Sequence, residues 1–196
     1  MALEDMHRVH LAPSPRRSSP ALFLDRDGTL IDDPGYLSDP NDVVLLPDAI
    51  DALHRFRAAG SALVLITNQS GIGRGYFGWE DYERVAARLR ELLAAEDIVL
   101  DAELVCGHAP EEGARCGWRK PAPGMIVEAA RRLNLDLPGS VMVGDMPSDL
   151  GAADAAGVGR VAHVLTGHGA RQRAAHAEWD LSARLDLIDG LSVLSP

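Results

Sequence analysis

The sequence Ala21-Leu22-Phe23-Leu24-Asp25-Arg26-Asp27-Gly28-Thr29 indicates a strand and a chemical site within nine residues. Four apolar residues in a row are typical of a short strand that is buried on both faces. Two aspartates follow where that strand ends, and Gly28 begins a turn. Because ligands of an open α/β sheet bind outside the carboxyl ends of its strands, the stretch also predicts where a functional site lies.

The rest of the chain alternates short apolar runs with amphipathic stretches, which is the pattern of a parallel sheet with crossover helices. Further strands are expected at residues 62–66, 103–106, 141–143 and 160–165. Helices are expected at residues 47–59, 79–94, 124–133 and 148–156. After Gly169 the pattern is ambiguous, and we expect a short strand and a last helix there. We predict one α/β domain over residues 21–196, with a Rossmann-like parallel sheet and helices on both faces.

Polar residues follow three of the expected strands directly. Asp25, Thr67 and Asp145 each come just after an apolar run. Since the carboxyl ends of parallel strands share one edge of a sheet, we expect these three side chains to converge.

The charge balance excludes some classes of partner. The 196 residues include 29 acidic and 19 basic side chains, for a formal net charge of −10. Nucleic-acid binding needs a basic face, and so does binding to an anionic membrane surface. We expect neither partner. Lys120 is the only lysine in the chain, and every other basic residue is an arginine. An anionic substrate must therefore be recruited by a few local cations or a metal ion.

The cysteine content, the apolar runs and the N-terminal residues indicate the cellular compartment. Two cysteines cannot build a disulfide framework, and no apolar run reaches the length of a membrane span. Residues 1–20 lack the apolar core of a signal peptide, and Pro, Ser and Arg dominate their second half. We expect a flexible N-terminal tail over residues 1–20 and a cytoplasmic protein.

The aspartates permit two interpretations. Asp25, Asp27 and Asp145 can hold one hard cation, since Mg²⁺ prefers carboxylate oxygens. One of them can instead act as a nucleophile toward phosphorus, as in aspartyl-phosphate chemistry. In the structural alternative, Asp25 and Asp27 cap a turn and Asp149 caps a helix.

Four motifs in order resemble those of the haloacid dehalogenase (HAD) superfamily of phosphatases, over about residues 22–169. They are Asp25-x-Asp27-Gly28-Thr29, Thr67-Asn68, Lys120-Pro121 and Gly144-Asp145-x-x-x-Asp149. A closer resemblance is to the heptose 1,7-bisphosphate phosphatases and the related histidinol-phosphate phosphatases. The stretches that carry it are residues 25–30, 33–36, 67–75 and 119–125.

The resemblance implies a role for each motif. Asp25 is expected to be the nucleophile and Asp27 the general acid and base. Mg²⁺ is expected on the Asp25 carboxylate, the Asp27 main-chain carbonyl and Asp145. Thr67 and Lys120 are expected to donate to the phosphoryl group, and Asp149 to support the site. An ammonium is a compact point charge, which suits a cramped site, although a solvated surface lysine is the structural alternative.

The connections leave no room for a cap domain, so substrate contacts are expected from loops. Arg74 is expected either to pair with a second phosphate or to stay solvated. Met146 stands where the heptose enzymes commonly have lysine, which removes a cation from the pocket. His163 and His168 are expected to be ordinary loop histidines. The residues expected to bind substrate are Asp33, Gly35, Tyr36, Asn68, Gln69, Ser70, Arg74 and Arg119.

Cys106-x-His108 and Cys116-x-Trp118 resemble the Cys-x-His…Cys-x-Cys zinc loop of the heptose bisphosphate phosphatases. Trp118 occupies the place of the last cysteine, so three ligands remain where structural zinc normally has four. The two interpretations are a zinc ion with a fourth ligand from elsewhere, and two reduced cysteines beside a surface histidine.

The resemblance implies a Mg²⁺-dependent phosphomonoesterase that acts on a small phosphorylated metabolite through an aspartyl-phosphate. The expected substrate is D-glycero-D-manno-heptose 1,7-bisphosphate, giving the 1-phosphate. The alternatives are histidinol phosphate or another small sugar phosphate, then the 3′-phosphate of a polynucleotide. A non-catalytic binding module on the same scaffold is the alternative from another class.

Overall fold

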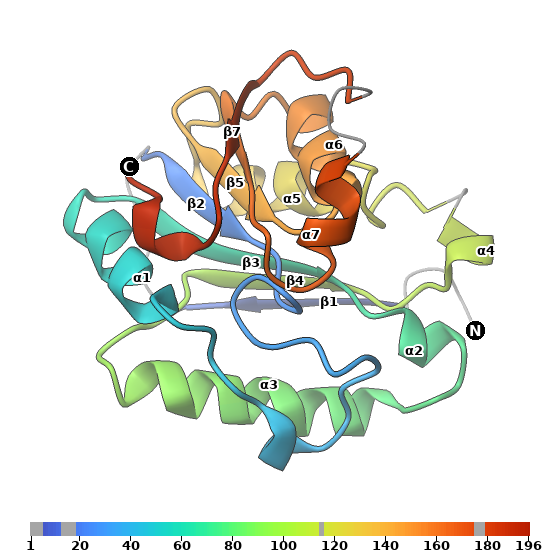
Figure 1. Ribbon diagram of the computed structural model, residues 1–196. Coiled ribbons are helices and arrows are strands. Elements are labelled where there is room, and N and C mark those ends of the chain that lie inside the picture. The colour runs from blue at the N-terminus through green and yellow to red at the C-terminus, as the bar shows by residue number, and fades with distance from the viewer. Residues whose placement is uncertain (1–5, 13–18, 114–115, 175–178) are drawn as a thin grey trace.

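A computed structural model describes residues 6–12, 19–113, 116–174 and 179–196. Strands alternate with helices along most of this length, as the sequence predicts (Figure 1). The strands are β1 (His7–Leu11), β2 (Ala21–Leu24), β3 (Ala62–Asn68), β4 (Ala102–Cys106), β5 (Val141–Gly144), β6 (Arg160–His163) and β7 (Arg184–Leu187). The α-helices are α1 (Ala49–Ala58), α2 (Ser70–Gly73), α3 (Trp79–Ala94), α4 (Pro110–Gly113), α5 (Gly124–Leu133), α6 (Pro147–Ala156) and α7 (Gly169–Gln172). Short 3₁₀ turns lie at η2 (Pro40–Asp42) and η4 (Leu191–Val193).

The strands form one seven-stranded sheet in the order β1-β4-β3-β2-β5-β6-β7. Strand β2, which ends at Leu24 just before Asp25, lies at its centre. The pairings from β4 to β7 are all parallel, with Leu24 opposite Leu65 of β3 and Val143 of β5. This confirms the predicted parallel α/β sheet.

Strand β1 corrects two expectations. It pairs antiparallel with β4, so the sheet is mostly rather than wholly parallel. Residues 7–11 are therefore an edge strand and not part of a flexible tail. The other residues of that expected tail, 1–5 and 13–18, lie outside the described residues. His-Arg-Val-His-Leu has no run of apolar residues, and pairing with β4 is what makes it a strand.

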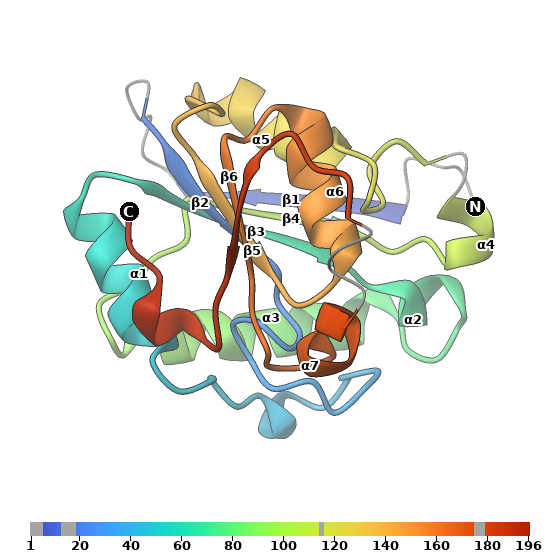
Figure 2. The ribbon, with the colours of Figure 1, turned by 45° about the horizontal axis from the view of Figure 1, so that its top comes forward.

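Helices cover both faces of the sheet (Figures 1 and 2). Helices α1 and α3 pack on one face, where Leu24 and Leu65 meet Phe56 and Leu89. Helices α5 and α6 pack on the other. Alternate residues of β2 explain the two layers, because Leu22 and Leu24 face α1 and α3 while Ala21 and Phe23 face α5 and α6.

This arrangement leaves the carboxyl ends of β2, β3 and β5 side by side and open. Among the described residues, the segments that follow these strands form loops and single helices, without a separate cap domain. The expected last helix is only the turn η4, preceded by strand β7. None of the helices in the described ranges is both long and apolar enough to cross a membrane.

Candidate active site

A cavity of about 380 Å³ opens at the carboxyl edge of the central strands. Twelve of the predicted site residues line it, and they come from five separate segments of the chain. These residues are Asp25, Asp27, Asp33, Gly35, Tyr36, Asn68, Gln69, Ser70, Arg119, Lys120, Asp145 and Asp149.

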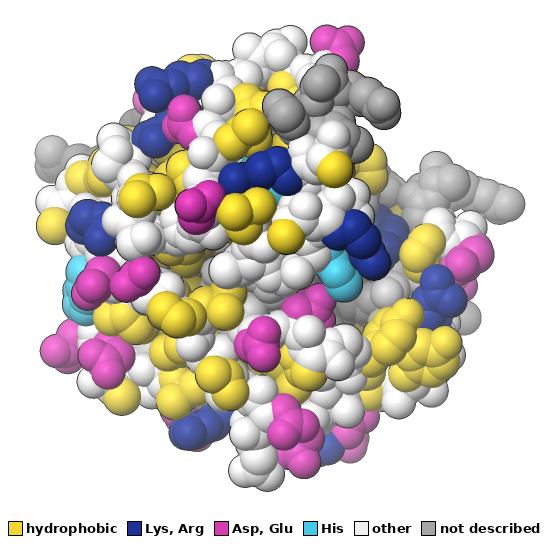
Figure 3. Space-filling model, in the orientation of Figure 1, with side chains coloured by type: hydrophobic (Ala, Val, Ile, Leu, Met, Phe, Trp, Pro, Cys, Tyr) yellow, Lys and Arg dark blue, Asp and Glu magenta, His cyan; other side chains and the backbone are white. Residues whose placement is uncertain are grey.

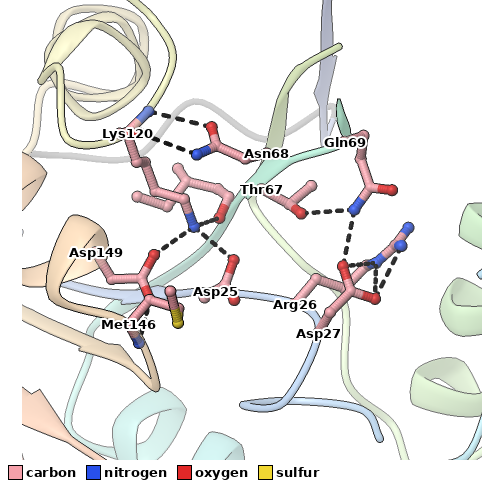
Figure 4. A network of polar contacts seen from close by, with 10 residues as sticks. Asp25, Arg26, Asp27, Thr67, Asn68, Gln69, Lys120, Met146 and Asp149 are labelled. Atoms are coloured by element: carbon pink, nitrogen blue, oxygen red, sulfur yellow. Dashed lines mark hydrogen bonds and ion pairs between the residues drawn. The ribbon is translucent and has the colours of Figure 1, made fainter. Parts of the chain in front are cut away.

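Lys120 lies at the floor of the cavity between two carboxylates (Figure 4). Its ammonium is 2.5 Å from Asp25 Oδ1 and 2.6 Å from Asp149 Oδ1. It also donates to the carbonyl of Ile66 at 3.0 Å. With 4% of the residue exposed, the sole lysine of the chain is a buried, fully engaged cation and not a surface residue.

The backbone on either side fixes this lysine. Asn68, the last residue of β3, holds the main chain of Lys120 from both directions, accepting from its N–H and donating to its carbonyl, each at 3.1 Å. The Asn68 side-chain amide thus positions Lys120, and the substrate contact predicted for Asn68, which lines the cavity, stays a prediction. Asp149 has a second bond as well, because its Oδ2 accepts from the N–H of Met146 at the start of α6. The cap expected of Asp149 and its support of the site occur together.

Asp145 supplies a third carboxylate. Oxygens of Asp25, Asp145 and Asp149 all lie within 4.8 Å of one another. Asp145 Oδ2 accepts from the N–H of His168, while its buried Oδ1 has no hydrogen-bond partner in the described part of the chain. A buried carboxylate oxygen without a partner is costly unless a cation engages it. With Lys120 paired to Asp149, the oxygens of Asp25 and Asp145 fit a hard divalent ion such as Mg²⁺.

The electrostatics of the cluster agree with a cation site. Burial raises the pKa of the Asp25 carboxyl well above its ordinary value, against the opposing effect of the Lys120 ammonium. Burial and the neighbouring Asp149 raise the pKa of Asp145 to about 6. Burial lowers the pKa of Lys120, but Asp149 and Asp25 outweigh it and the net pKa is raised. Lys120 therefore stays charged, while the carboxylates need a further positive charge to stay ionised together.

Asp27 is held on the other side of the pocket by Arg26 and Gln69 (Figure 4). Arg26 donates to both Asp27 oxygens at 2.9–3.1 Å, and Gln69 Nε2 donates to Oδ2 at 2.8 Å. The same Gln69 nitrogen donates to the hydroxyl of Thr67 at 2.9 Å. Thr67 is buried behind Gln69 and does not line the cavity.

The rim consists of the turn that follows β2 and the loops opposite it. Asp33 Oδ2 lies 3.3 Å from His168 Nε2, and the Tyr36 ring packs edge-on against Tyr76, with the ring centroids 4.6 Å apart. Arg74 lies outside the cavity lining and pairs with exposed Glu111 at 3.1 Å.

Six further residues line the cavity besides the predicted site residues, namely Arg26, Leu37, Gly71, Met146, Ser148 and His168. Most of them adjoin a predicted residue in sequence. His168 is the exception. The loop after β6 brings it to the rim, and no sequence motif predicts this position. His163, the last residue of β6, does not line the cavity, and its Nε2 contacts the buried carbonyl of Asp145.

The cysteines form a second cluster beside the pocket. The Sγ atoms of Cys106 and Cys116 are 3.6 Å apart, and His108 Nδ1 is 3.5 Å from Cys106 Sγ. His7 of β1 joins them, with Nε2 3.2 Å from Cys116 Sγ, although no sequence motif points to it. Burial raises the pKa of the Cys106 thiol to about 12, so this thiol stays protonated unless a metal ion replaces the proton. Arg119 links the cluster to the pocket by donating from Nη1 to the carbonyl of His108 at 2.8 Å.

This fold, with a carboxylate cluster and one lysine at the ends of its central strands, defines a hydrolase of the HAD-like class. A family model described as HAD-hydrolase-like matches residues 117–190. The D-glycero-beta-D-manno-heptose-1,7-bisphosphate 7-phosphatase of Escherichia coli is 39% identical over 177 residues, which cover 87% of this chain and 93% of that protein. The chain belongs to this family of heptose bisphosphate phosphatases.

Two further relatives agree. The protein of the same name from Mesorhizobium japonicum is 46% identical over 144 residues, covering 71% of this chain and 66% of its own. The crystal structure of D,D-heptose 1,7-bisphosphate phosphatase from B. bronchiseptica, complexed with magnesium and phosphate, superposes with a TM-score of 0.77 at 33% identity. It covers 88% of this chain and 94% of that structure. The resemblance seen in the motifs is therefore confirmed over most of the chain.

Proposed function

We propose that this protein removes the 7-phosphate of D-glycero-β-D-manno-heptose 1,7-bisphosphate and releases the 1-phosphate. The observation that carries the proposal is the Lys120 ammonium, buried between Asp25 and Asp149 at the floor of an open cavity. Relatives at 39–46% identity are named for this reaction.

The chemistry begins at Asp25. Its carboxylate attacks phosphorus in line, forms an aspartyl-phosphate and breaks the bond from phosphorus to the sugar oxygen. Asp27 gives a proton to the departing oxygen, then takes one from the water that cleaves the aspartyl-phosphate. Because Arg26 and Gln69 hold both Asp27 oxygens, the side chain exchanges these contacts when it turns to the leaving oxygen.

Positive charge is the second requirement of phosphoryl transfer. Asp25, Asp145 and the main-chain carbonyl of Asp27 would hold Mg²⁺, which when bound neutralises charge on the transferred group. Lys120 donates to an equatorial oxygen of that group. The Thr67 hydroxyl, which Gln69 covers, donates to it as well when the phosphoryl group displaces the Gln69 amide.

The rim suits the rest of a sugar bisphosphate. Within the described residues no cap domain covers the cavity, and Arg119 lines it together with Asp33, Gly35 and Tyr36. We assign Arg119 the second phosphate, since Met146 offers no charge there and Arg74 pairs with Glu111. On the face that Figure 3 displays, acidic and basic side chains are interspersed and form no broad basic patch, which disfavours a polynucleotide substrate.

A phosphate-release panel tests the proposal. It compares heptose 1,7-bisphosphate, histidinol phosphate and a 3′-phosphorylated oligonucleotide, each with and without Mg²⁺. We expect the bisphosphate to give the highest kcat/KM and to yield the 1-phosphate. Preferred turnover of histidinol phosphate would refute the substrate assignment but keep the phosphatase mechanism. No Mg²⁺-dependent release from any of them would refute both.

We also propose that Cys106, His108 and Cys116 hold a structural zinc ion. Their donor atoms are thiolates and an imidazole, which are ordinary zinc ligands, and the two sulfurs are nearly in contact. Elemental analysis of protein purified without chelator tests this, with about one equivalent of zinc expected. Less than about a tenth of an equivalent would contradict it.

A further inference from the structure

Structural zinc takes four protein ligands, and the loop from Cys106 to Cys116 supplies three. Trp118 stands where a fourth would complete the loop. We propose that His7 of strand β1 is the fourth ligand, so that zinc fastens the N-terminal edge strand to the loop that presents Arg119 and Lys120. This inference rests on the zinc site proposed above.

The spacing of the four donor atoms agrees with a tetrahedron. Zinc bonds of about 2.3 Å to sulfur and 2.0–2.1 Å to nitrogen place tetrahedral neighbours about 3.3–3.8 Å apart. The structure has 3.2 Å from His7 Nε2 to Cys116 Sγ, 3.5 Å from Cys106 Sγ to His108 Nδ1 and 3.6 Å between the sulfurs. All four donor atoms lie within 4.8 Å of one another.

The pairing of β1 with β4 explains why His7, and not His10 of the same strand, lies beside the cysteines. His7 is directly opposite Cys106 in the antiparallel register. His10 lies three residues further along, opposite Glu103, and its Nε2 is 3.1 Å from Glu83. The two histidines of β1 therefore serve as a test residue and its matched control.

Trp118 has a role that differs from that of a ligand. Its ring stacks on the His7 imidazole, with centroids 4.5 Å apart and an angle of 12° between the planes. This contact orients the imidazole so that Nε2 faces Cys116. His7, from another part of the chain, would thus take the place of a ligand at position 118, and Trp118 positions its imidazole.

The proposed link reaches the active site by short steps. The carbonyl of Met6 accepts from the N–H of Gly107, so β1 already adjoins the loop through the backbone. The carbonyl of His108 then accepts from Arg119, whose neighbour Lys120 contacts Asp25. Zinc would add bonds between these segments to the hydrogen bonds and the His7–Trp118 stacking that join them.

The test compares zinc affinity and zinc coordination in the full chain. Chelator-stripped wild type, His7→Ala and His10→Ala are titrated with Zn²⁺ in competition with a chromogenic chelator. We expect His7→Ala to bind zinc at least about 100-fold more weakly, since losing even an outer-shell partner typically costs 10–100-fold. His10→Ala should match wild type.

X-ray absorption at the zinc edge of wild type gives a second measurement that does not depend on how a variant folds. Two sulfurs and two imidazole nitrogens are expected, with one imidazole remaining in His7→Ala. A wild-type protein that binds zinc with one imidazole, or a His7→Ala protein with unchanged affinity, would overturn the role of His7. A wild-type protein that binds no zinc would overturn the zinc site itself.

Discussion

Replacing Lys120 by arginine keeps the positive charge but changes its shape, which separates two explanations of the site. If charge alone matters, arginine should serve. The ammonium, however, donates to three oxygens at 2.5–3.0 Å within a buried pocket. A guanidinium is a wide planar fork that cannot occupy this position without displacing Asp25 or Asp149.

The expected losses follow from the contacts. A misplaced donor to the transferred phosphoryl group costs about 10²–10³-fold in kcat, which is the effect of removing one preorganised donor. Overpacking by the larger group costs about 1–3 kcal/mol of stability. Lys120→Met removes the charge instead and leaves two buried carboxylates, at about 3–5 kcal/mol. For a chain of this size that is a fall in Tm of about 6–20 °C.

The assay measures phosphate release at saturating Mg²⁺ and substrate, with thermal unfolding followed in a chelator so that bound metal does not mask the loss. Arg131→Met is the control, because Arg131 is an exposed helix residue paired with Glu128. Its thermal unfolding should match that of the wild type. A Lys120→Arg enzyme with a kcat within about threefold of the wild-type value would refute the explanation by shape. Such a change in kcat corresponds to under about 1 kcal/mol of activation free energy.

Three further predictions concern the carboxylates. Asp25→Asn should retain the fold and lower kcat at least about 10⁴-fold, as loss of a nucleophile does, and retained turnover would assign that role elsewhere. The pKa of Asp145 is raised to about 6, and the ionised form is the one that binds metal. Calorimetric Mg²⁺ affinity should therefore weaken at least about tenfold from pH 7 to pH 5, since the pKa of the other carboxylate ligand, Asp25, is raised as well; a flat profile would contradict this. In Gly144→Ala the new Cβ would lie 2.3–2.5 Å from atoms of Asp149, so we expect a loss of about 1–3 kcal/mol in chemical denaturation. Gly190→Ala, where nothing lies within 4 Å, is its control and should be neutral.

The sequence predicts the central site well because its residues follow strong strand patterns. Asp25 and Asp145 come directly after apolar runs, so a parallel sheet brings them together whatever the loops do. The boundaries of β2, α3 and α5 also match, since apolar spacing and a following turn mark their ends.

Long-range contacts account for what the sequence missed. Strand β1 has little apolar pattern of its own, and its pairing with β4 spans almost a hundred residues. His7 could not be placed beside Cys116 without that pairing. In the same way, no sequence pattern predicts that the Asn68 amide bonds to the backbone of Lys120, 52 positions away.

The position of β2 in the sheet has a consequence for the order in which the protein can acquire its metals during synthesis. Asp25 and Asp145 meet only when β2 pairs with β5, so a nascent chain cannot assemble the magnesium site until most of the domain has emerged. Cys106, His108 and Cys116 lie within eleven consecutive residues, and His7 emerges before all of them. If both proposed metal ions bind, zinc is therefore captured first, and a stalled chain long enough to bring Cys116 but not Asp145 out of the ribosome should retain zinc without a magnesium site.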